Sequence, residues 1–232
     1  ALIRWQRDGK WVPPSVFIPL AEEAGLVTRV DMFVLYTACR QIGEWLRLGI
    51  NDVRVAVNMS TRSIQAANFV ERVQQIISEN NTPKDLIELE VTETSLMSDL
   101  TIASKAISTL HDRGIHVALD DFGTGYSSLR YLNAMPFSCL KVDKSFIDGL
   151  NAASAKENSN DLVKGTLALA RGLGKEIVAE GVEDPSQLGF LNQENCAIIQ
   201  GYIFSKPLSA VECTEFLLHQ REYIDKVMKS VS

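Results

Sequence analysis

Six short apolar runs along this chain each end in polar side chains, and a stretch with helical periodicity follows each run. The runs cover residues 53–57, 86–89, 116–119, 139–140, 177–179 and 197–199, and the polar residues after them are Asn58, Glu90, Asp120, Asp121, Lys141, Asp143, Glu180 and Gln200. Short apolar runs with polar ends are typical of buried strands. Strands that alternate with helices predict a parallel sheet whose carboxyl ends carry the site.

Helical periodicity fills the stretches between these runs. Apolar residues recur at three- and four-residue intervals over 32–48, 69–77, 102–110, 162–173 and 211–227, which predicts amphipathic helices. Asp184 before Pro185 predicts an N-cap followed by proline in the first helical turn. Strands and helices are therefore predicted to alternate along the whole chain.

The number of strands favours a closed (β/α)8 barrel over an open doubly wound sheet. With Ala1–Trp5 counted as an opening strand, the sequence holds seven candidates, whereas a barrel needs eight. A doubly wound sheet usually has a glycine-rich phosphate loop after its first strand, and none follows Ala1–Trp5. We predict one TIM-like α/β barrel domain over residues 1–232, with the first strand of its pattern missing upstream of Ala1.

Composition excludes several classes of function. A net charge of −6 argues against duplex nucleic acid as a partner, because such a partner calls for a basic face. A small anionic ligand stays possible, since a metal bound to carboxylates makes a site locally positive.

No apolar run is long enough to span a membrane, and charges near the start argue against a signal peptide. Four cysteines without a C-x-x-C pair predict free thiols and a cytoplasmic domain.

The alternation of strand side chains gives a geometric prediction. Arg54 and Asn58 share one face of their strand, as Glu88 and Glu90 do on the next. If Asn58 and Glu90 lie at the mouth of the barrel, Arg54 and Glu88 lie deeper, where neither charge is stable alone. We predict that Arg54 and Glu88 pair across adjacent strands, within about 6 Å.

The polar strand ends belong to an ordered set of motifs that resembles one known family. The motifs are Val57–Ser60, Glu90–Glu93, Asp120–Ser128, Lys141–Asp143, Ala179–Glu183 and Gln200–Tyr202. Together they resemble the EAL-domain family of bacterial cyclic di-GMP phosphodiesterases, from Ala1 to about Leu217. The resemblance implies a barrel enzyme that hydrolyses cyclic di-GMP to linear pGpG. It also implies a homodimer, with a sensor or cyclase domain, and in some proteins a membrane anchor, upstream of this domain.

The resemblance implies two divalent cations, Mg²⁺ or Mn²⁺. Asn58, Glu90 and Asp120 would hold one ion, and Asp120 would bridge to a second ion held with Asp121 and Glu180. Oxygen ligands suit these hard cations better than zinc, and two ions about 3.5–4 Å apart activate a bridging water. The resemblance also implicates Glu180 as general base, a role that overlaps with metal binding.

The resemblance assigns the remaining site residues to the phosphate, the pocket and a loop. Lys141 would neutralise the phosphate or orient the water, and Asp143 would hold that lysine or support the metal ligands; Asp143 could equally cap the stretch after it. The implied substrate contacts are Leu2, Arg4, Asp143, Glu183 and Gln200, with Arg4 at a phosphate. Residues 121–128 match a loop that reaches a dimer partner, anchored by Glu93 through Ser127 or Ser128.

One family residue is missing. Ala1-Leu2 matches the last two letters of the motif that names the family, so its glutamate, a metal ligand, would lie immediately before Ala1. One explanation is a clipped sequence. The other is a chain that lacks this ligand and binds metal poorly.

Two other functions compete with hydrolysis. A receptor would bind cyclic di-GMP without cleaving it, which the missing glutamate favours and the retained Lys141, Asp120 and Glu180 oppose. An unrelated barrel enzyme would use Lys141 as a Schiff-base nucleophile. That chemistry needs an uncharged amine, whereas acidic neighbours stabilise the charged form.

Overall fold

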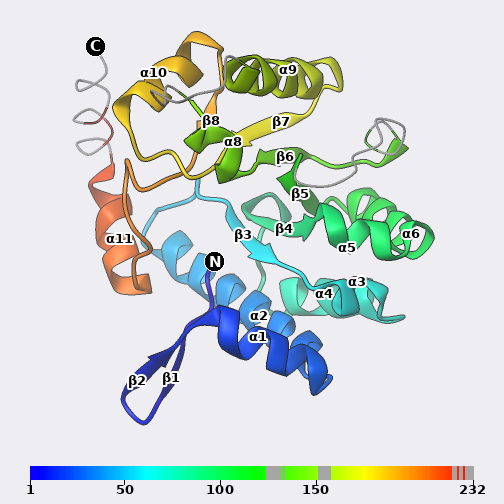
Figure 1. Cartoon of the computed structure of the whole chain (residues 1–232). Coiled ribbons are helices and arrows are strands. Elements are labelled where there is room, and N and C mark those ends of the chain that lie inside the picture. The colour runs from blue at the N-terminus through cyan, green and yellow to red at the C-terminus, as the bar shows by residue number, and fades with distance from the viewer. Residues whose placement is uncertain (124–131, 133, 151–157, 221–223, 225–226, 228–232) are drawn as a thin grey trace. The chain divides into compact units, whose positions relative to one another are not determined.

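The computed structural model describes residues 1–123, 132, 134–150, 158–220, 224 and 227. These residues fall into two compact units, which comprise residues 1–117 and the described part of residues 118–232. Figure 1 shows the elements of both units along the chain. Whether residues 1–232 form one domain stays a prediction.

The first unit opens with a β-hairpin and then alternates between helices and parallel strands. Its elements are β1 (Trp5–Arg7), β2 (Lys10–Val12), α1 (Pro14–Glu23), α2 (Val27–Arg47), β3 (Val55–Asn58), α3 (Thr61–Gln65), α4 (Phe69–Glu79), a 3₁₀ turn η1 (Lys84–Leu86), β4 (Ile87–Thr92), α5 (Glu93–Ser98) and α6 (Leu100–Asp112).

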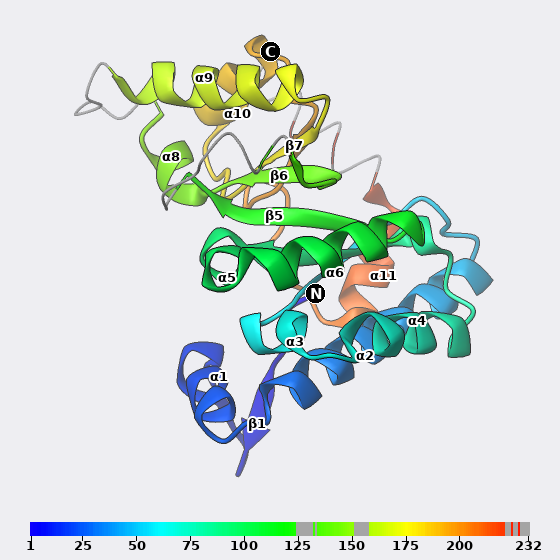
Figure 2. The same cartoon turned by 90° about the vertical axis from the view of Figure 1, so that its right-hand side faces the viewer.

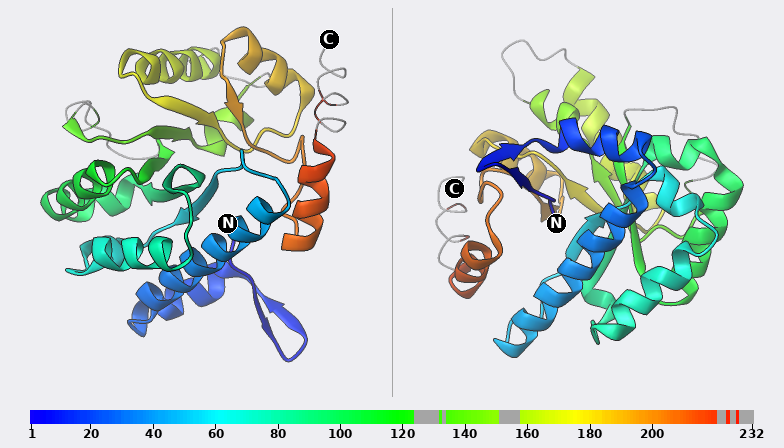
Figure 3. Two further views of the ribbon diagram at one scale, coloured as in Figure 1. Left: turned by 180° about the vertical axis from the view of Figure 1, so that it is seen from behind. Right: turned by 90° about the horizontal axis from the view of Figure 1, so that it is seen from below.

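The predicted opening strand over Ala1–Trp5 is wrong. Ala1–Arg4 have no regular secondary structure, and Trp5 belongs to the antiparallel pair β1–β2, drawn in dark blue in Figure 3. The chain reverses at Asp8-Gly9, where both residues have positive φ, as a tight hairpin turn of the Asp-Gly type requires. The terminal amine of Ala1 donates to the carbonyl of Ala56, so the start of the chain lies beside β3.

Helix α2 shows why the helices form where the sequence predicts them. Its residues Val27, Leu35, Cys39, Ile42 and Trp45 recur at helical spacing and are all buried. This apolar stripe packs on the unit's core, which is the burial that stabilises an amphipathic helix. Helices α4 and α6 repeat the pattern within the predicted stretches 69–77 and 102–110.

Strands β3 and β4 confirm the predicted parallel pairing and its consequence. Ala56 lies opposite Glu88 and Asn58 opposite Glu90. The Arg54 guanidinium Nη1 lies 3.4 Å from Glu88 Oε2, well inside the distance that the alternation of side chains predicted. Glu88 is buried, so Arg54 provides the positive charge that this carboxylate needs.

The second unit repeats the alternation. Its elements are β5 (His116–Phe122), which starts just before the boundary, β6 (Cys139–Val142), α8 (Lys144–Asp148), α9 (Asn158–Gly172), β7 (Glu176–Ala179), α10 (Pro185–Gln193), β8 (Ile198–Ile199) and α11 (Ala210–Leu218). Strands β5, β6, β7 and β8 lie side by side in this order and all run parallel. Figure 2 shows β5, β6 and β7 as neighbours.

Several smaller predictions are confirmed in the described residues. Asp184 caps α10 and Pro185 opens it, and the four cysteines are thiols outside any disulfide. Burial raises the pKa of the thiols of Cys39 and Cys196, which makes both poor nucleophiles. In the described part of the chain, no helix is both long and apolar enough to cross a membrane.

Candidate functional site

In the first unit, Asn58 and Glu90 form a pair at the carboxyl ends of β3 and β4. Their backbones are in register, and Asn58 Nδ2 donates to Glu90 Oε2 at 3.0 Å. The next backbone amide, that of Met59, donates to the Glu90 carbonyl at 2.9 Å. Two of the predicted metal ligands are therefore side by side, and an amide oxygen and a carboxylate lie at one strand edge.

A buried carboxylate on α2 holds the segment after Asn58. Asp31 Oδ2 accepts from the amide of Ser60 at 2.9 Å, the hydroxyl of Ser60 at 2.6 Å and the hydroxyl of Ser63 at 2.6 Å. Ser60 in turn caps α3. Sequence reasoning missed Asp31, although a signal was present: Asp31 occupies the apolar stripe of its helix, four residues from both Val27 and Leu35.

A cavity of about 360 Å³ adjoins this pair in the first unit. Leu2, Arg4 and Asn58 line it, so two of the predicted substrate contacts share one cavity with a predicted metal ligand. Asp31 and Ser95 also reach its wall. Arg4 is exposed, and its Nη1 donates to the carbonyl of Ile3 at 3.0 Å. The wall thus combines apolar surface, hydroxyl groups, two carboxylates and one guanidinium.

The predicted loop anchor is described only at one end. Glu93 opens α5 after the N-cap Thr92 and is 1% exposed. Its predicted partners, Ser127 and Ser128, lie outside the described residues. The anchor therefore stays a prediction.

In the second unit, Lys141 lies between two carboxylates. Its Nζ is 3.4 Å from Asp120 Oδ1 and forms an ion pair with Glu180 Oε1. Lys141 is 4% exposed, and a buried ammonium is stable only with such partners. The strands set the arrangement: Val142 lies opposite Ala179, and the Glu180 amide donates to the Val142 carbonyl at 3.1 Å.

The backbone is irregular at the end of β5, where its register with β6 shifts between Leu119 and Phe122. Asp121 has φ +55° and its amide donates to Asp120 Oδ1 at 3.0 Å. Gly123 has φ +98°, and a Cβ there would press on the ring of Phe146. Only glycine fits this combination of backbone and neighbour. The irregular stretch therefore includes both adjacent aspartates.

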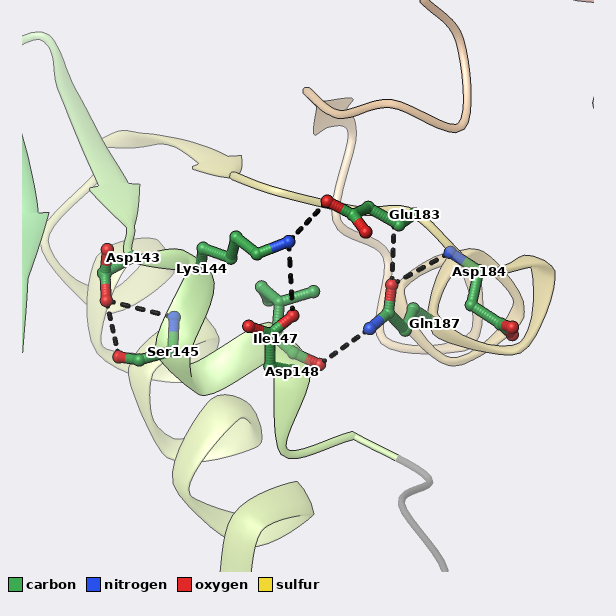
Figure 4. A network of polar contacts seen from close by, with 8 residues as sticks. All are labelled: Asp143, Lys144, Ser145, Ile147, Asp148, Glu183, Asp184 and Gln187. Atoms are coloured by element: carbon green, nitrogen blue, oxygen red, sulfur yellow. Dashed lines mark hydrogen bonds and ion pairs between the residues drawn. The ribbon is translucent and has the colours of Figure 1, made fainter. Parts of the chain in front are cut away.

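Asp143 acts as a helix cap. Its Oδ1 accepts from the amide of Ser145 at 3.0 Å and from the Ser145 hydroxyl at 2.5 Å, as Figure 4 shows. This contact is the capping alternative that the sequence left open. Within the described residues, its hydrogen bonds go to Ser145 and not to Lys141.

The loop after β7 is tied to α8 and to the segment after β8. Glu183 Oε1 lies 2.5 Å from Lys144 Nζ, and this contact is the main cause that raises the pKa of Lys144. The backbone amide of Gln200 donates to the Ala179 carbonyl at 2.8 Å, and the backbone carbonyl of Gln200 accepts from the Val182 amide at 3.1 Å. Glu183 and Gln200 therefore lie on neighbouring segments beyond the ends of β7 and β8.

The predicted metal ligands fall into two sets. Asn58 and Glu90 belong to the first unit, and Asp120, Asp121 and Glu180 to the second. Among the described residues, no three histidine, cysteine, aspartate or glutamate side chains lie close enough together to hold a metal ion. All five donors are nevertheless hard oxygens, which is the chemistry that Mg²⁺ and Mn²⁺ prefer.

Comparison with known proteins gives one consistent result. The sequence model of the EAL domain family matches residues 1–207. The cyclic di-GMP phosphodiesterase NbdA of Pseudomonas aeruginosa is 38% identical over 94% of this chain, and the signaling protein YkoW of Bacillus subtilis is 35% identical over 92%. The matches cover only 28% and 26% of those relatives, so the chain spans about a quarter of their length.

Solved structures agree. The PaMucR phosphodiesterase in complex with c-di-GMP is 36% identical and has a TM-score of 0.85, with 90% of this chain and 84% of that chain covered. The cAMP-bound EAL enzyme Bd1971 is 29% identical, also with a TM-score of 0.85, over 93% of this chain and 60% of that chain. These likenesses confirm the predicted fold class, a TIM-like α/β fold.

Proposed function

Because this chain belongs to the EAL domain family, we propose that it is a phosphodiesterase that hydrolyses cyclic di-GMP to linear pGpG. A relative named for this activity covers 94% of the chain. The observation that carries the proposal is the buried Lys141, held between Asp120 and Glu180 at the carboxyl ends of three neighbouring strands. A fixed cation beside two acids is suited to stabilising the charge of a phosphate and to orienting an attacking water.

We propose that two Mg²⁺ or Mn²⁺ ions bind to the five oxygen ligands, with Asn58 and Glu90 from one unit and Asp120, Asp121 and Glu180 from the other. EAL phosphodiesterases generally depend on divalent metal, and the hard donor set fits such ions. When bound, the ions lower the pKa of water and neutralise charge on the phosphate.

Different side chains of this chain would then perform the separate steps of the reaction. Glu180 accepts a proton from the attacking water, whose oxygen forms the new bond to phosphorus. The bond from phosphorus to the ribose 3′-oxygen breaks, and that oxygen takes up a proton from solvent as it leaves. Lys141 stabilises the charge on the phosphate oxygens. Arg4 binds a phosphate at the cavity that Leu2 helps to line, and Glu183 and Gln200 are further substrate contacts.

Substitutions of Glu180 and Asp120 test the proposal. Glu180→Gln and Asp120→Asn keep the side-chain shape and remove an anionic ligand, so we expect turnover to fall by at least about 100-fold. The matched control is Glu176→Gln, which changes an exposed residue at the other end of the same strand β7. Formation of pGpG is measured by chromatography, with and without a chelator.

Binding measured beside turnover separates hydrolysis from the receptor alternative. A parent chain that binds cyclic di-GMP and leaves it intact with Mg²⁺ or Mn²⁺ present would contradict the proposal and favour a receptor. Full activity in both Glu180→Gln and Asp120→Asn would contradict the assigned roles.

The partners of the domain are part of the same proposal. MucR of Pseudomonas aeruginosa, a bifunctional diguanylate cyclase and cyclic di-GMP phosphodiesterase, is 38% identical over 90% of this chain, which matches 30% of MucR. This relation supports a cyclase domain beside the present one, and a sensor domain stays a prediction. The homodimer, the Glu93 loop anchor and the cytoplasmic location stay predictions.

A further inference from the structure

Gln187 joins two loops of the second unit that carry groups of the proposed reaction. One loop leads from Lys141 on β6 into α8, and the other leads from Glu180 after β7 into α10. The Gln187 side chain lies between them, as Figure 4 shows, and it is 8% exposed. This residue was not among the sequence-based candidates.

Both the oxygen and the nitrogen of the Gln187 side-chain amide form hydrogen bonds. Oε1 accepts from the backbone amides of Glu183 at 2.9 Å and Asp184 at 3.1 Å, and Nε2 donates to the carbonyl of Ile147 at 3.1 Å. Ile147 is fully buried on α8. Because buried backbone groups need partners, these three hydrogen bonds hold α8 and the loop after β7 at a fixed spacing.

A second connection between the same loops is weaker. Lys144 on α8 pairs with Glu183 at 2.5 Å and with Asp148 at 3.5 Å, but the side chains of Lys144 and Glu183 are 45% and 47% exposed. Exposed ion pairs contribute little because water and salt compete with them. Of these two side-chain connections, the buried amide of Gln187 is therefore the stronger one.

We propose that Gln187 is a positioning residue, which fixes the distance and orientation between the Lys141 ammonium and the Glu180 carboxylate. The inference rests on the proposed function, because Lys141 and Glu180 are the groups that we assign to hydrolysis. A displacement of about 1 Å at reacting groups can lower a rate by about 100-fold. Gln187 acts through these two residues and does not touch the substrate.

Gln187→Met is the first test, because methionine keeps the length of the side chain and removes both hydrogen-bonding groups. We expect kcat to fall by about 10- to 100-fold, while KM for cyclic di-GMP stays within about threefold of the parent value. Gln193→Met is the matched control: it changes an exposed glutamine at the end of the same helix and leaves kcat unchanged. Circular dichroism at the assay temperature verifies folding.

Gln187→Glu keeps the inference testable if Gln187→Met does not fold. Its carboxylate still accepts from Glu183 and Asp184 but cannot donate to Ile147, so the link to α8 is lost and a carboxylate oxygen faces the Ile147 carbonyl instead. We expect a fall in kcat of at least about tenfold. A folded variant at Gln187 with the parent kcat, or one in which KM alone changes, would overturn the inference.

Amide hydrogen exchange separates this inference from the proposed function. An inactive parent chain would overturn the proposed function alone. The positioning role is then read from exchange at residues 144–148 and 180–184, which we expect to speed up in both segments in Gln187→Met and in neither in Gln193→Met. Unchanged protection in Gln187→Met would overturn the positioning role whatever the activity.

Discussion

At the scale of single residues, the surroundings of a polar group decide what it can do. The buried ammonium of Lys141 has carboxylates on two sides, which stabilise its charged form. This arrangement argues against the Schiff-base alternative, because that nucleophile must be uncharged. Asp184 shows the same dependence on surroundings at the surface, where hydrogen bonds from Ser186 lower the pKa of its carboxyl group.

The cap at Asp184 gives a prediction for pH. The pKa of this carboxyl is lower in the folded than in the unfolded chain, so its contribution is present above the unfolded value of about 4 and is lost as the pH falls through the folded value. We expect the melting temperature of Asp184→Ala to lie below that of the parent at pH 7, with a difference that shrinks in acid. Thermal scans across pH measure this.

Asp184→Asn is the matched control for that experiment. Asparagine still caps α10 but does not titrate in this range. The difference in melting temperature between Asp184→Asn and Asp184→Ala should therefore stay nearly constant as the pH falls. A gap between parent and Asp184→Ala that grew in acid would contradict the assignment.

At the scale of elements, close backbone contact shapes the loops around Glu180. A Cβ at Gly201 would overlap the backbone nitrogen and carbonyl of Val182, and the two segments also exchange hydrogen bonds there. A Cβ at Gly181, which has φ +71°, would overlap the side chain of Lys144. These glycines allow the segment after β8 and helix α8 to pack against the loop that follows β7.

Gly201→Ala is predicted to destabilise the fold. The neighbouring atoms belong to the backbone and cannot turn aside, so we expect a loss of about 1–3 kcal/mol in the free energy of unfolding. Gly165→Ala is the matched control, since a Cβ at this position within α9 meets nothing within 4 Å. There we expect a gain of about 0.5–1 kcal/mol, because alanine favours helix. Denaturant unfolding measures both, and equal effects would contradict the packing argument.

At the scale of the whole molecule, the proposed metal ligands come from both compact units. Asn58 and Glu90 are paired in the first, and Asp120, Asp121 and Glu180 belong to the second. A ligand that binds only the folded chain stabilises it by mass action. If two cations need both sets, loss of a ligand from either unit should abolish the stabilisation.

Thermal unfolding with Mn²⁺ or Mg²⁺ tests this requirement. At about 100 times the dissociation constant the ion should stabilise the parent by about 2.7 kcal/mol, or roughly 5–10 °C in melting temperature for a chain of this size. We expect Glu90→Gln and Asp120→Asn each to remove most of this shift. Glu71→Gln, an exposed change in the first unit, should keep it. A full shift in either ligand variant would contradict the role assigned to that ligand.

The sequence by itself determined the order of the elements and the residues at their ends. Apolar periods of 3.6 and 2 residues are local properties, so they located the main helices, the parallel strands and the polar residues that follow them, and the ordered motifs identified the family. Alternation along two strands was even enough to predict the contact between Arg54 and Glu88.

Only the tertiary structure decided which groups pair and which support others. The opening segment is a hairpin, and Asp143 caps a helix. Lys141 lies between two acids. Asp31 and Gln187 are buried residues that support the neighbouring loops. The physical reason is that these contacts join residues far apart in sequence. Strand register and burial fix such contacts, and no local pattern encodes either one completely.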